Sequence, residues 1–315
     1  MKGRLMRTVK AATAAVVMLV VAAIGFVYLA PEYAGRLFFD LQRSRAGFER
    51  REIQLGNGLH YVYLEGGRGA PLMLLHGFGG DKDNFNQVAR YLTPLYRVIV
   101  PDQIGFGESS HPMDGDYRPV AQAALLRDLA RSLGITALHL GGNSMGGQIA
   151  LTYAALYPEE VKSLWLLDTA GVWSGPKSAM RKAMEKTGKN PLMVSNDDEF
   201  VRLLSVIMSK PPFIPRPILN VAARAKMRNY PLEQRIFKDI GADSVEGRVA
   251  GLKTPAMIVW GGEDQVISVQ TAEILHKLMP RSKVVVMPGI GHVPMIEDPR
   301  ESADDYLKFR AELGE

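Results

Sequence analysis

The stretch "HLGGNSMGGQIAL", residues 139–151, decides how the rest of the chain is interpreted. A single serine, Ser144, stands between glycines, after an apolar run typical of a buried strand and before a run with helical spacing. A glycine-rich turn that merely joins a strand to a helix has the same composition. The alternative is a nucleophile held on a strained bend, where Gly142 and Gly146 leave space that larger side chains would fill.

Apolar runs and helical patterns alternate on both sides of this stretch. Residues 51–67 contain two alternating runs around a Gly-Asn-Gly turn and predict a hairpin. Six further strands are predicted at residues 71–77, 96–102, 137–143, 163–168, 255–262 and 283–289. Helices are predicted between them, at residues 86–92, 123–134, 146–158 and 271–279. This order predicts an α/β fold with a mostly parallel, eight-stranded sheet and helices on both faces.

The alternation stops between residues 173 and 250, an excursion too long for a loop. We expect a helical cap there, inserted into a core formed by residues 50–172 and 251–315. Several large apolar residues of the cap are expected either to line an adaptable pocket or to pack the cap on the core. They are Met180, Met184, Met193, Met208, Met227, Phe200 and Phe213.

The N-terminal segment has the composition of a membrane anchor. Residues 11–30 are uncharged, and as a helix they would measure about 30 Å, the hydrocarbon thickness of a bilayer. A removed signal peptide and a buried core helix are the alternatives, but the run is long, lacks an A-x-A-like cleavage site and has no polar face. We therefore expect residues 1–30 to be a cytoplasmic tail followed by a single-pass anchor.

The charges around the anchor indicate its orientation. Basic residues precede it at positions 2, 4, 7 and 10, which predicts a cytoplasmic N-terminus and a catalytic body on the extracytoplasmic side of the inner membrane. Residues 31–49 mix apolar side chains with arginines and are expected to form a juxtamembrane helix, at the lipid interface or against the body. The small residues of "AATAA" would permit a homodimer in the membrane.

Composition excludes several classes of function. The formal net charge is +5, but the basic N-terminal tail accounts for most of it, so no nucleic-acid partner is expected. The absence of cysteine excludes disulfides, thiol catalysis and cysteine-based zinc sites. Because no metal-ligand spacing, phosphate-binding loop or dinucleotide fingerprint is present, we expect neither a metal nor a cofactor.

Two motifs indicate acyl transfer. "GNSMG", residues 142–146, fits G-x-S-x-G in the required place between a strand and a helix, which makes Ser144 the candidate nucleophile. "HGFGG", residues 76–80, follows another strand and fits an oxyanion-hole loop. The two N–H donors that acyl transfer needs would come from Phe78 and Met145. We expect His76 to brace this loop rather than to react.

The acid and the base follow later in the chain. Asp264 comes directly after one predicted strand and His292 after the last, which gives the order serine, aspartate, histidine. His292 would take the serine proton and return it to the leaving group, while Asp264 would orient the imidazole. Glu263 and Asp168 are the alternative acids, and Asp102 is expected to brace a loop.

With "HGFGG", "PDQIGFGES", "GNSMGG", "WGGEDQVI" and "GHVPMIEDP" in this order, the chain from about residue 50 onward resembles the α/β-hydrolases. Together with the expected anchor, it resembles membrane-bound monoacylglycerol lipases and the bacterial thermolabile lipases and phospholipases A. This resemblance implies ester hydrolysis of acylglycerols, lysophospholipids or phospholipids. It also implies a triad of Ser144, Asp264 and His292, with Phe78 and Met145 as oxyanion donors.

Two other functions are compatible with the motifs. "GNSMGG" also occurs in carbon–carbon bond hydrolases of ring-cleavage products, but those typically have a tryptophan after the catalytic histidine, where this chain has Val293. A hydrolase-fold protein that only binds would be expected to lack a triad position, and none is missing here.

Overall fold

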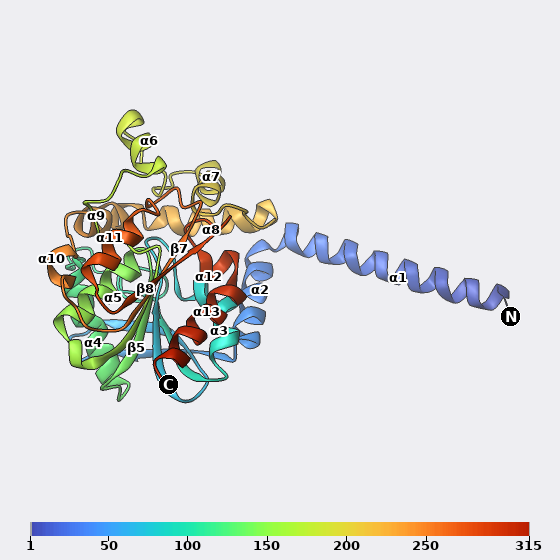
Figure 1. Cartoon of the computed structure of the whole chain (residues 1–315). Coiled ribbons are helices and arrows are strands. Elements are labelled where there is room, and N and C mark those ends of the chain that lie inside the picture. Colours follow the sequence, from blue (N-terminus) through green and yellow to red (C-terminus); the bar gives the residue numbers. More distant parts are fainter. Residues whose placement is uncertain (1, 315) are drawn as a thin grey trace.

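An eight-stranded sheet forms the centre of the body in the computed structural model, which describes residues 2–314 (Figure 1). The strand order is β1-β2-β4-β3-β5-β6-β7-β8. β2 is antiparallel to both of its neighbours, and all other pairs are parallel. The strands are β1 (Phe48–Gln54), β2 (His60–Gly66), β3 (Ala70–Leu75), β4 (Tyr96–Pro101), β5 (Leu138–Asn143), β6 (Val161–Leu167), β7 (Ala256–Gly261) and β8 (Ser282–Met287). The predicted hairpin and the six later strands are all present.

Two apolar layers cover opposite faces of the sheet. Met73 and Leu75 of β3 belong to one layer, with α4, α5 and α11, whereas Leu72 and Leu74 belong to the other, with α3 and α13. Because the central strands are buried on both faces, their sequences are apolar without interruption. The helices of the body are α3 (Asn86–Leu92), α4 (Pro119–Ser132), α5 (Met145–Leu156), α10 (Glu246–Val249), α11 (Thr271–Leu278), α12 (Pro294–Glu297) and α13 (Pro299–Glu312), with short 3-10 helices η1 (Lys82–Phe85) and η2 (Pro158–Glu160).

Four helices between β6 and β7 form a separate layer at the top of Figure 1. They are α6 (Ala179–Thr187), α7 (Asp197–Ile207), α8 (Arg216–Arg228) and α9 (Tyr230–Gly241), and we call them the cap helices. They contact the body over the loops that follow β3 and β4: Lys226 lies against Gly79, and Ile236 lies against Gly105. These four helices lie within the excursion expected at residues 173–250.

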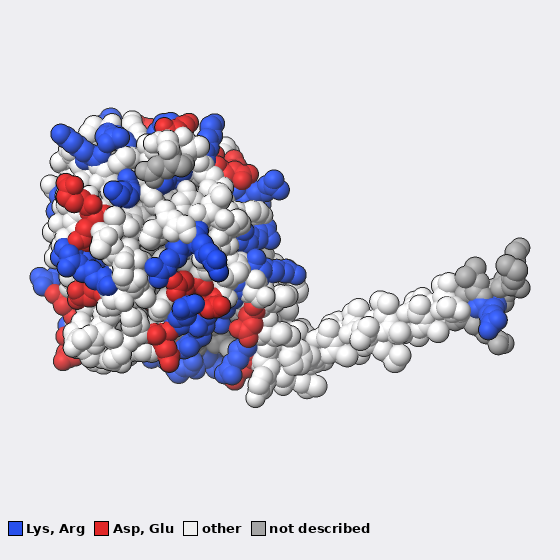
Figure 2. Space-filling model, turned by 90° about the horizontal axis from the view of Figure 1, so that it is seen from below, with Lys and Arg blue, Asp and Glu red and all other residues white. Residues whose placement is uncertain are grey.

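The first helix, α1 (Lys2–Leu29), points away from the body, whereas α2 (Pro31–Arg45) lies against it (Figure 1). Thr8–Leu29 is long and apolar enough to cross a membrane, and none of this segment is buried in the body. Figure 2 shows the same contrast, because the part of α1 nearer the body is free of charge, with basic side chains only near its far end, while the body carries both signs. Residues 1 and 315 and the side chains of Lys2, Leu5 and Arg7 lie outside the described part of the chain, which leaves two basic residues of the expected tail undescribed.

α2 is tied to the body by a bidentate ion pair. Nε and Nη2 of Arg43 donate to the two carboxylate oxygens of Asp83 in η1, at 2.7 and 2.6 Å. The expected helix over residues 31–49 is longer than the observed one, which ends at Arg45. Gly47 (φ 69°) turns the chain there, and β1 already begins at Phe48. The core therefore begins two residues earlier than the expected residue 50.

Candidate active site

The candidate residues gather at the carboxyl ends of the parallel strands. The loop of residues 76–80 follows β3, Ser144 follows β5, Asp264 follows β7 and His292 follows β8. In a parallel sheet these ends meet at one edge, which is where α/β proteins bind their ligands. The fold thus brings together residues that are far apart in the sequence.

Ser144 occupies a strained bend between β5 and α5. Its backbone angles are φ 53° and ψ −116°, and only one other non-glycine residue within residues 2–314, Asp168, has a positive φ. Such a conformation costs about 1–3 kcal/mol and persists only where the surroundings impose it. Here the Ser144 N–H donates to the Leu167 carbonyl at 2.9 Å, while the Ser144 carbonyl accepts from Gln148 and Ala170.

Three glycines make this bend possible. A Cβ atom on Gly142 would overlap the backbone of Gly146, and one on Gly146 would overlap the carbonyl of Leu75. A Cβ on Gly147 would collide with the side chain of Thr169. The glycines around Ser144 are therefore needed for close approach of the backbone, which a simple connecting turn would not require.

The loop of residues 76–80 packs against the nucleophile. A Cβ on Gly77 would lie 3.3 Å from the Cβ of Ser144, so the backbone that leads to Phe78 passes directly beside it. Met145 is the first residue of α5, where backbone N–H groups have no partner within the helix. Within residues 2–314, neither the Phe78 N–H nor the Met145 N–H has an acceptor. Both groups remain available to stabilise an oxyanion.

His76 braces this loop. Its Nδ1–H donates to the Gly77 carbonyl at 2.8 Å, and its Nε2 accepts from the Gln103 N–H at 3.0 Å, an arrangement that requires the neutral ring. Complete burial lowers the pKa of His76 and favours the same neutral form. As the sequence suggested, His76 has a structural role.

Asp102 braces the neighbouring turn, again as expected. One of its oxygens accepts from the Lys82 backbone at 2.7 Å, and the other accepts from the Lys82 ammonium and the Glu108 backbone, both at 2.8 Å. The charged pair of Lys82 and Asp102 is buried, so its hydrogen bonds are needed to offset the loss of hydration.

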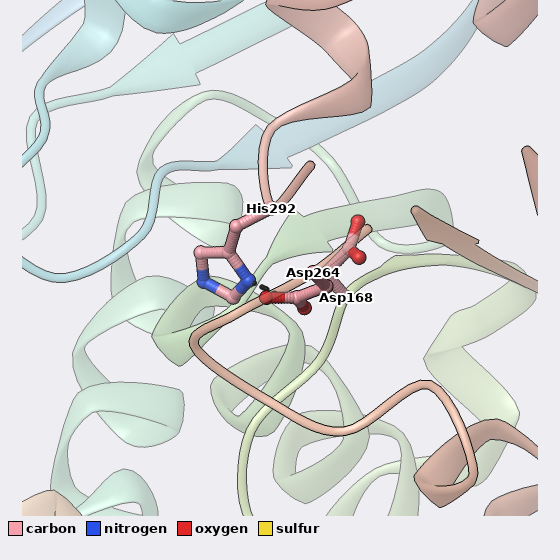
Figure 3. A group of neighbouring side chains, drawn as sticks. All are labelled: Asp168, Asp264 and His292. Carbon is pink, nitrogen blue, oxygen red and sulfur yellow. Dashed lines mark hydrogen bonds and ion pairs between the residues drawn. The ribbon is translucent and has the colours of Figure 1, made fainter. Parts of the chain in front are cut away.

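His292 pairs with Asp264. Nδ1 of His292 lies 2.8 Å from Oδ2 of Asp264, whose side chain is completely buried (Figure 3). Oδ1 of Asp264 accepts from the backbone N–H groups of Val266 and Ile267, at 2.7 and 3.1 Å. Asp264, and not the adjacent Glu263, is therefore the carboxylate that orients the imidazole.

Asp168 lies beside this pair rather than in it (Figure 3). The polar atoms of Asp168, Asp264 and His292 all lie within 4.8 Å of one another. Two carboxylates and an imidazole could hold a cation, but Nδ1 of His292 and Oδ2 of Asp264 are engaged with each other. The sequence predicts these two residues as the acid and the base, and the structure brings them into contact.

Sequence reasoning did not identify Asn143, which precedes the nucleophile. Its side-chain amide donates to the main-chain oxygen of His292 at 2.9 Å and to that of Leu167 at 3.1 Å. The amide thereby ties the histidine loop to the bend that carries Ser144. The only signal in the sequence was the position of Asn143 inside the "GNSMG" motif.

The cap contains a cavity of about 650 Å³ between the end of α6, α7 and the start of α9. Met193 is the one member of the expected apolar set that lines it, and within residues 2–314 no candidate catalytic residue does so. Phe213 is 92% exposed, so for this residue both expectations, pocket lining and core packing, were wrong. Its loop, between α7 and α8, is rich in proline.

Comparison with known proteins gives the family. A family model described as alpha/beta hydrolase fold matches residues 70–198 and 213–299. The chain belongs to the α/β-hydrolase family. Its sheet order, the strained serine after β5 and the histidine after β8 fit this α/β-hydrolase assignment.

Relatives of this α/β-hydrolase are lipases. Lipase 1 of Psychrobacter immobilis is 42% identical over 280 residues, which cover 86% of this chain and 87% of the relative. Monoacylglycerol lipase ABHD6 of Rattus norvegicus is 26% identical over 295 residues, or 88% of this chain and 87% of the relative. A crystal structure described as a membrane phospholipase A, a bacterial virulence factor, has a TM-score of 0.87 and 36% identity, and covers 96% of this chain and 98% of that one. The chain is accordingly a lipase- or phospholipase-type α/β-hydrolase and a carboxylic ester hydrolase.

Proposed function

We propose that this α/β-hydrolase is a membrane-anchored serine lipase that cleaves acylglycerols, lysophospholipids or phospholipids through an acyl-enzyme. The observation that carries the proposal is the positive φ of Ser144 at the junction of β5 and α5, because backbone strain of this kind gathers at active sites, where it can present a side chain to a substrate. In this proposal Ser144, His292 and Asp264 are the triad, and the N–H groups of Phe78 and Met145 are the oxyanion donors.

The geometry supports the following sequence of steps. Ser144 Oγ attacks the ester carbonyl while Nε2 of His292, the ring nitrogen not bonded to Asp264, takes its proton. The negative charge on the carbonyl oxygen is stabilised by the two free N–H groups. His292 then protonates the departing alcohol, and the acyl group stays on Ser144. Water, deprotonated by His292, finally releases the fatty acid and restores the serine.

We further propose that α1 is a single-pass anchor in the inner membrane, with the N-terminus cytoplasmic and the body extracytoplasmic. The unburied apolar surface of α1 supports this, as does the likeness to the membrane phospholipase A. On α2, Tyr33, Leu37 and Phe38 expose more than half of their side-chain surface, which suits a helix at the lipid interface. Anchoring raises the concentration of bilayer-borne substrate near the enzyme. A homodimer through α1 stays a prediction, which cross-linking in membranes would test.

The experiment compares membranes that contain the full chain with membranes that contain Ser144→Ala. Lipids are profiled by mass spectrometry, and the serine is labelled with a fluorophosphonate. We expect the unaltered enzyme to release fatty acids and to be labelled, and Ser144→Ala to do neither. Ser132→Ala, at an exposed serine that ends α4, is the matched control and should behave like the unaltered enzyme.

Two results would contradict the proposal. One is full fatty-acid release by Ser144→Ala, which would remove the serine from the mechanism. The other is faster cleavage of a ring-cleavage dienoate than of any carboxylic ester, which would favour a carbon–carbon bond hydrolase. Val293, which follows His292 and precedes α12, makes the second result unexpected.

A further inference from the structure

One carboxyl oxygen of Asp168 has a hydrogen-bond partner in the described chain, and the other has none. The residue follows β6, is completely buried and has a positive φ of 45°. Its Oδ1 accepts from the Gly261 N–H at 2.8 Å, but its buried Oδ2 has no partner within residues 2–314. An ionised carboxylate with an unsatisfied oxygen in such a place is costly, so the ionic form of Asp168 is disfavoured.

Asp264 has an unused hydrogen-bond acceptor site that could accept a hydrogen bond from Asp168. A carboxylate has about four lone-pair sites. Val266 and Ile267 donate to Oδ1, and His292 donates to Oδ2, which leaves one site open. The carboxyl groups of Asp168 and Asp264 are neighbours, with polar atoms within 4.8 Å of each other (Figure 3). A single proton between them would satisfy both the orphaned oxygen and the open site.

We propose that Asp168 is a neutral carboxylic acid in the working enzyme and that its Oδ2–H donates a hydrogen bond to Asp264, which holds the carboxylate that orients His292. Asp168 is thus a positioning residue that acts through Asp264 and does not touch the substrate. The inference rests on the proposed function, because it assigns Asp168 a role in the proposed triad.

The charges around Asp168 agree with a neutral acid. Burial raises the pKa of Asp168 well above its ordinary value, and the negative charge of Asp264 raises it further. Glu297 at the end of α12 adds a third acidic group that acts in the same direction. The imidazole of His292 is already engaged by Asp264, so it does not supply Asp168 with a counter-charge.

The shared proton has two consequences for the triad. It removes the repulsion between two adjacent carboxylates, and it holds Asp264 with Oδ2 toward the imidazole. It also spreads part of the Asp264 charge away from His292. Loss of this donor would concentrate the charge on Oδ2 and favour the protonated imidazole, so a higher pH would be needed to obtain the neutral base.

The test uses two variants with opposite expectations. Asp168→Asn has nearly the shape of a protonated aspartic acid: its oxygen can accept from Gly261, and its amide can donate to Asp264. Asp168→Ala removes the donor. Each variant is assayed as the full chain for hydrolysis of a p-nitrophenyl ester across pH, with Asp264→Asn as the reference for a lost triad acid.

We expect Asp168→Asn to keep kcat within about threefold of the unaltered enzyme and to keep the midpoint of the acid limb of its pH profile. For Asp168→Ala we expect kcat to fall by about tenfold at an unchanged KM, and the acid limb to move to higher pH. A role limited to packing would not move the acid limb in either variant, so the position of the acid limb in Asp168→Ala separates the two explanations. Asp264→Asn should be far more impaired than either variant.

Two kinetic results would overturn the inference. If Asp168→Asn is as impaired as Asp264→Asn, Asp168 acts as an anion and is itself a triad acid. If Asp168→Ala keeps both kcat and the acid limb, the proton between the carboxyls has no role in positioning.

A spectroscopic measurement covers the case in which Asp168→Ala fails to fold. The infrared spectrum of the unaltered enzyme at neutral pH should contain the carbonyl band of a protonated carboxylic acid, and Asp168→Asn should lose it. Absence of that band in the unaltered enzyme would overturn the inference without reference to activity. Fluorophosphonate labelling of Ser144 is measured in parallel, because its failure would instead mark failure of the proposed function.

Discussion

The side-chain amide of Asn143 and the main-chain oxygen of His292 are joined by a hydrogen bond of 2.9 Å. These residues are 149 positions apart in the sequence. Asn143 ends β5 directly before the proposed nucleophile, and His292 is the proposed base in the loop after β8. The same amide also holds the end of β6 through the Leu167 carbonyl. One buried side chain thus fixes the ends of β5 and β6 and the loop of His292 relative to one another.

We expect Asn143→Ala to lower kcat by about tenfold with little change in KM, because the loop of His292 loses its tie to the nucleophile bend. Asn143→Asp keeps the size of the side chain but loses the two N–H donors, so it should be at least as impaired. Steady-state kinetics with a p-nitrophenyl ester provide the measurement. Unchanged kcat in both variants would show that the hydrogen bond does not position His292.

Gly147→Ala should destabilise the fold. Its Cβ would collide with the side chain of Thr169, and overpacking of this kind costs about 1–3 kcal/mol. Thr169→Ala in the same chain removes the obstructing atoms, so the double variant should be less destabilised than the sum of the two single changes. Gly247→Ala, at a glycine in open space, is the control. Urea denaturation measures the free energies of unfolding of the unaltered protein and of each variant. If the losses of the two single variants simply add up in the double variant, this account is contradicted.

A buried charge pair within the cap lies against the loop that carries Phe78. Lys226 of α8 lies 2.7 Å from Glu233 of α9, and its ammonium stands 5.2 Å from the ring centre of Phe78. Burial raises the pKa of Glu233, so this carboxylate depends on Lys226 for its charge. Loss of one partner from such a pair typically costs about 3–5 kcal/mol.

We therefore expect Lys226→Met to destabilise the protein and to lower kcat/KM, because the loop that carries Phe78 loses its support from the cap. The double change Lys226→Met and Glu233→Leu leaves no unpaired charge and should recover most of the stability. Thermal unfolding and ester kinetics on the three variants check this. A double variant no more stable than Lys226→Met would contradict the explanation by an unpaired charge.

Ionisation of Glu160 makes the stability of the body depend on pH. The hydrogen bond from Arg127 lowers the pKa of Glu160 to about 2, from an ordinary value of 4.5. Because the folded-state pKa lies below the unfolded one, folding favours the ionised form. The stabilisation is complete above about pH 4.5 and is lost as the pH falls toward 2.

Glu160→Gln should thus lower the free energy of unfolding at pH 7, and its difference from the unaltered protein should shrink as the pH falls below 4.5. Glu159→Gln, at an exposed neighbour, should show no such trend. Urea denaturation at several pH values is the measurement. A difference independent of pH would show that the loss arises from packing and not from charge.

The strands and the order of the candidate triad could be predicted because their signals are local. A strand buried on both faces requires an apolar run, and the bend at Ser144 requires glycines at fixed positions. α7 and α9 were not predicted individually. α7 follows the Asn196 cap, α9 begins at Tyr230 directly before a proline, and neither is longer than 12 residues. Short amphipathic helices of this kind depend on the surface they cover.

The supporting residues of the site could not be predicted, because their roles depend on partners far away in the sequence. Asn143 acts on His292, and Lys226 acts on the Phe78 loop, yet no spacing in the sequence connects either pair. Asp168 was weighed only as an alternative acid, since the sequence does not show that one of its oxygens is left without a partner.

The order of the elements along the chain also has a consequence for biosynthesis. α1 is translated before every strand of the sheet, whereas His292 follows β8, the last strand of the sheet. A growing chain therefore contains the proposed anchor long before it contains the proposed base. Until the last strand has been made and has paired with β7, the ribosome-bound chain has a serine on a bend but no means of activating it. Under the proposed function, lipids near the nascent chain would therefore not be cleaved before His292 has been made and placed.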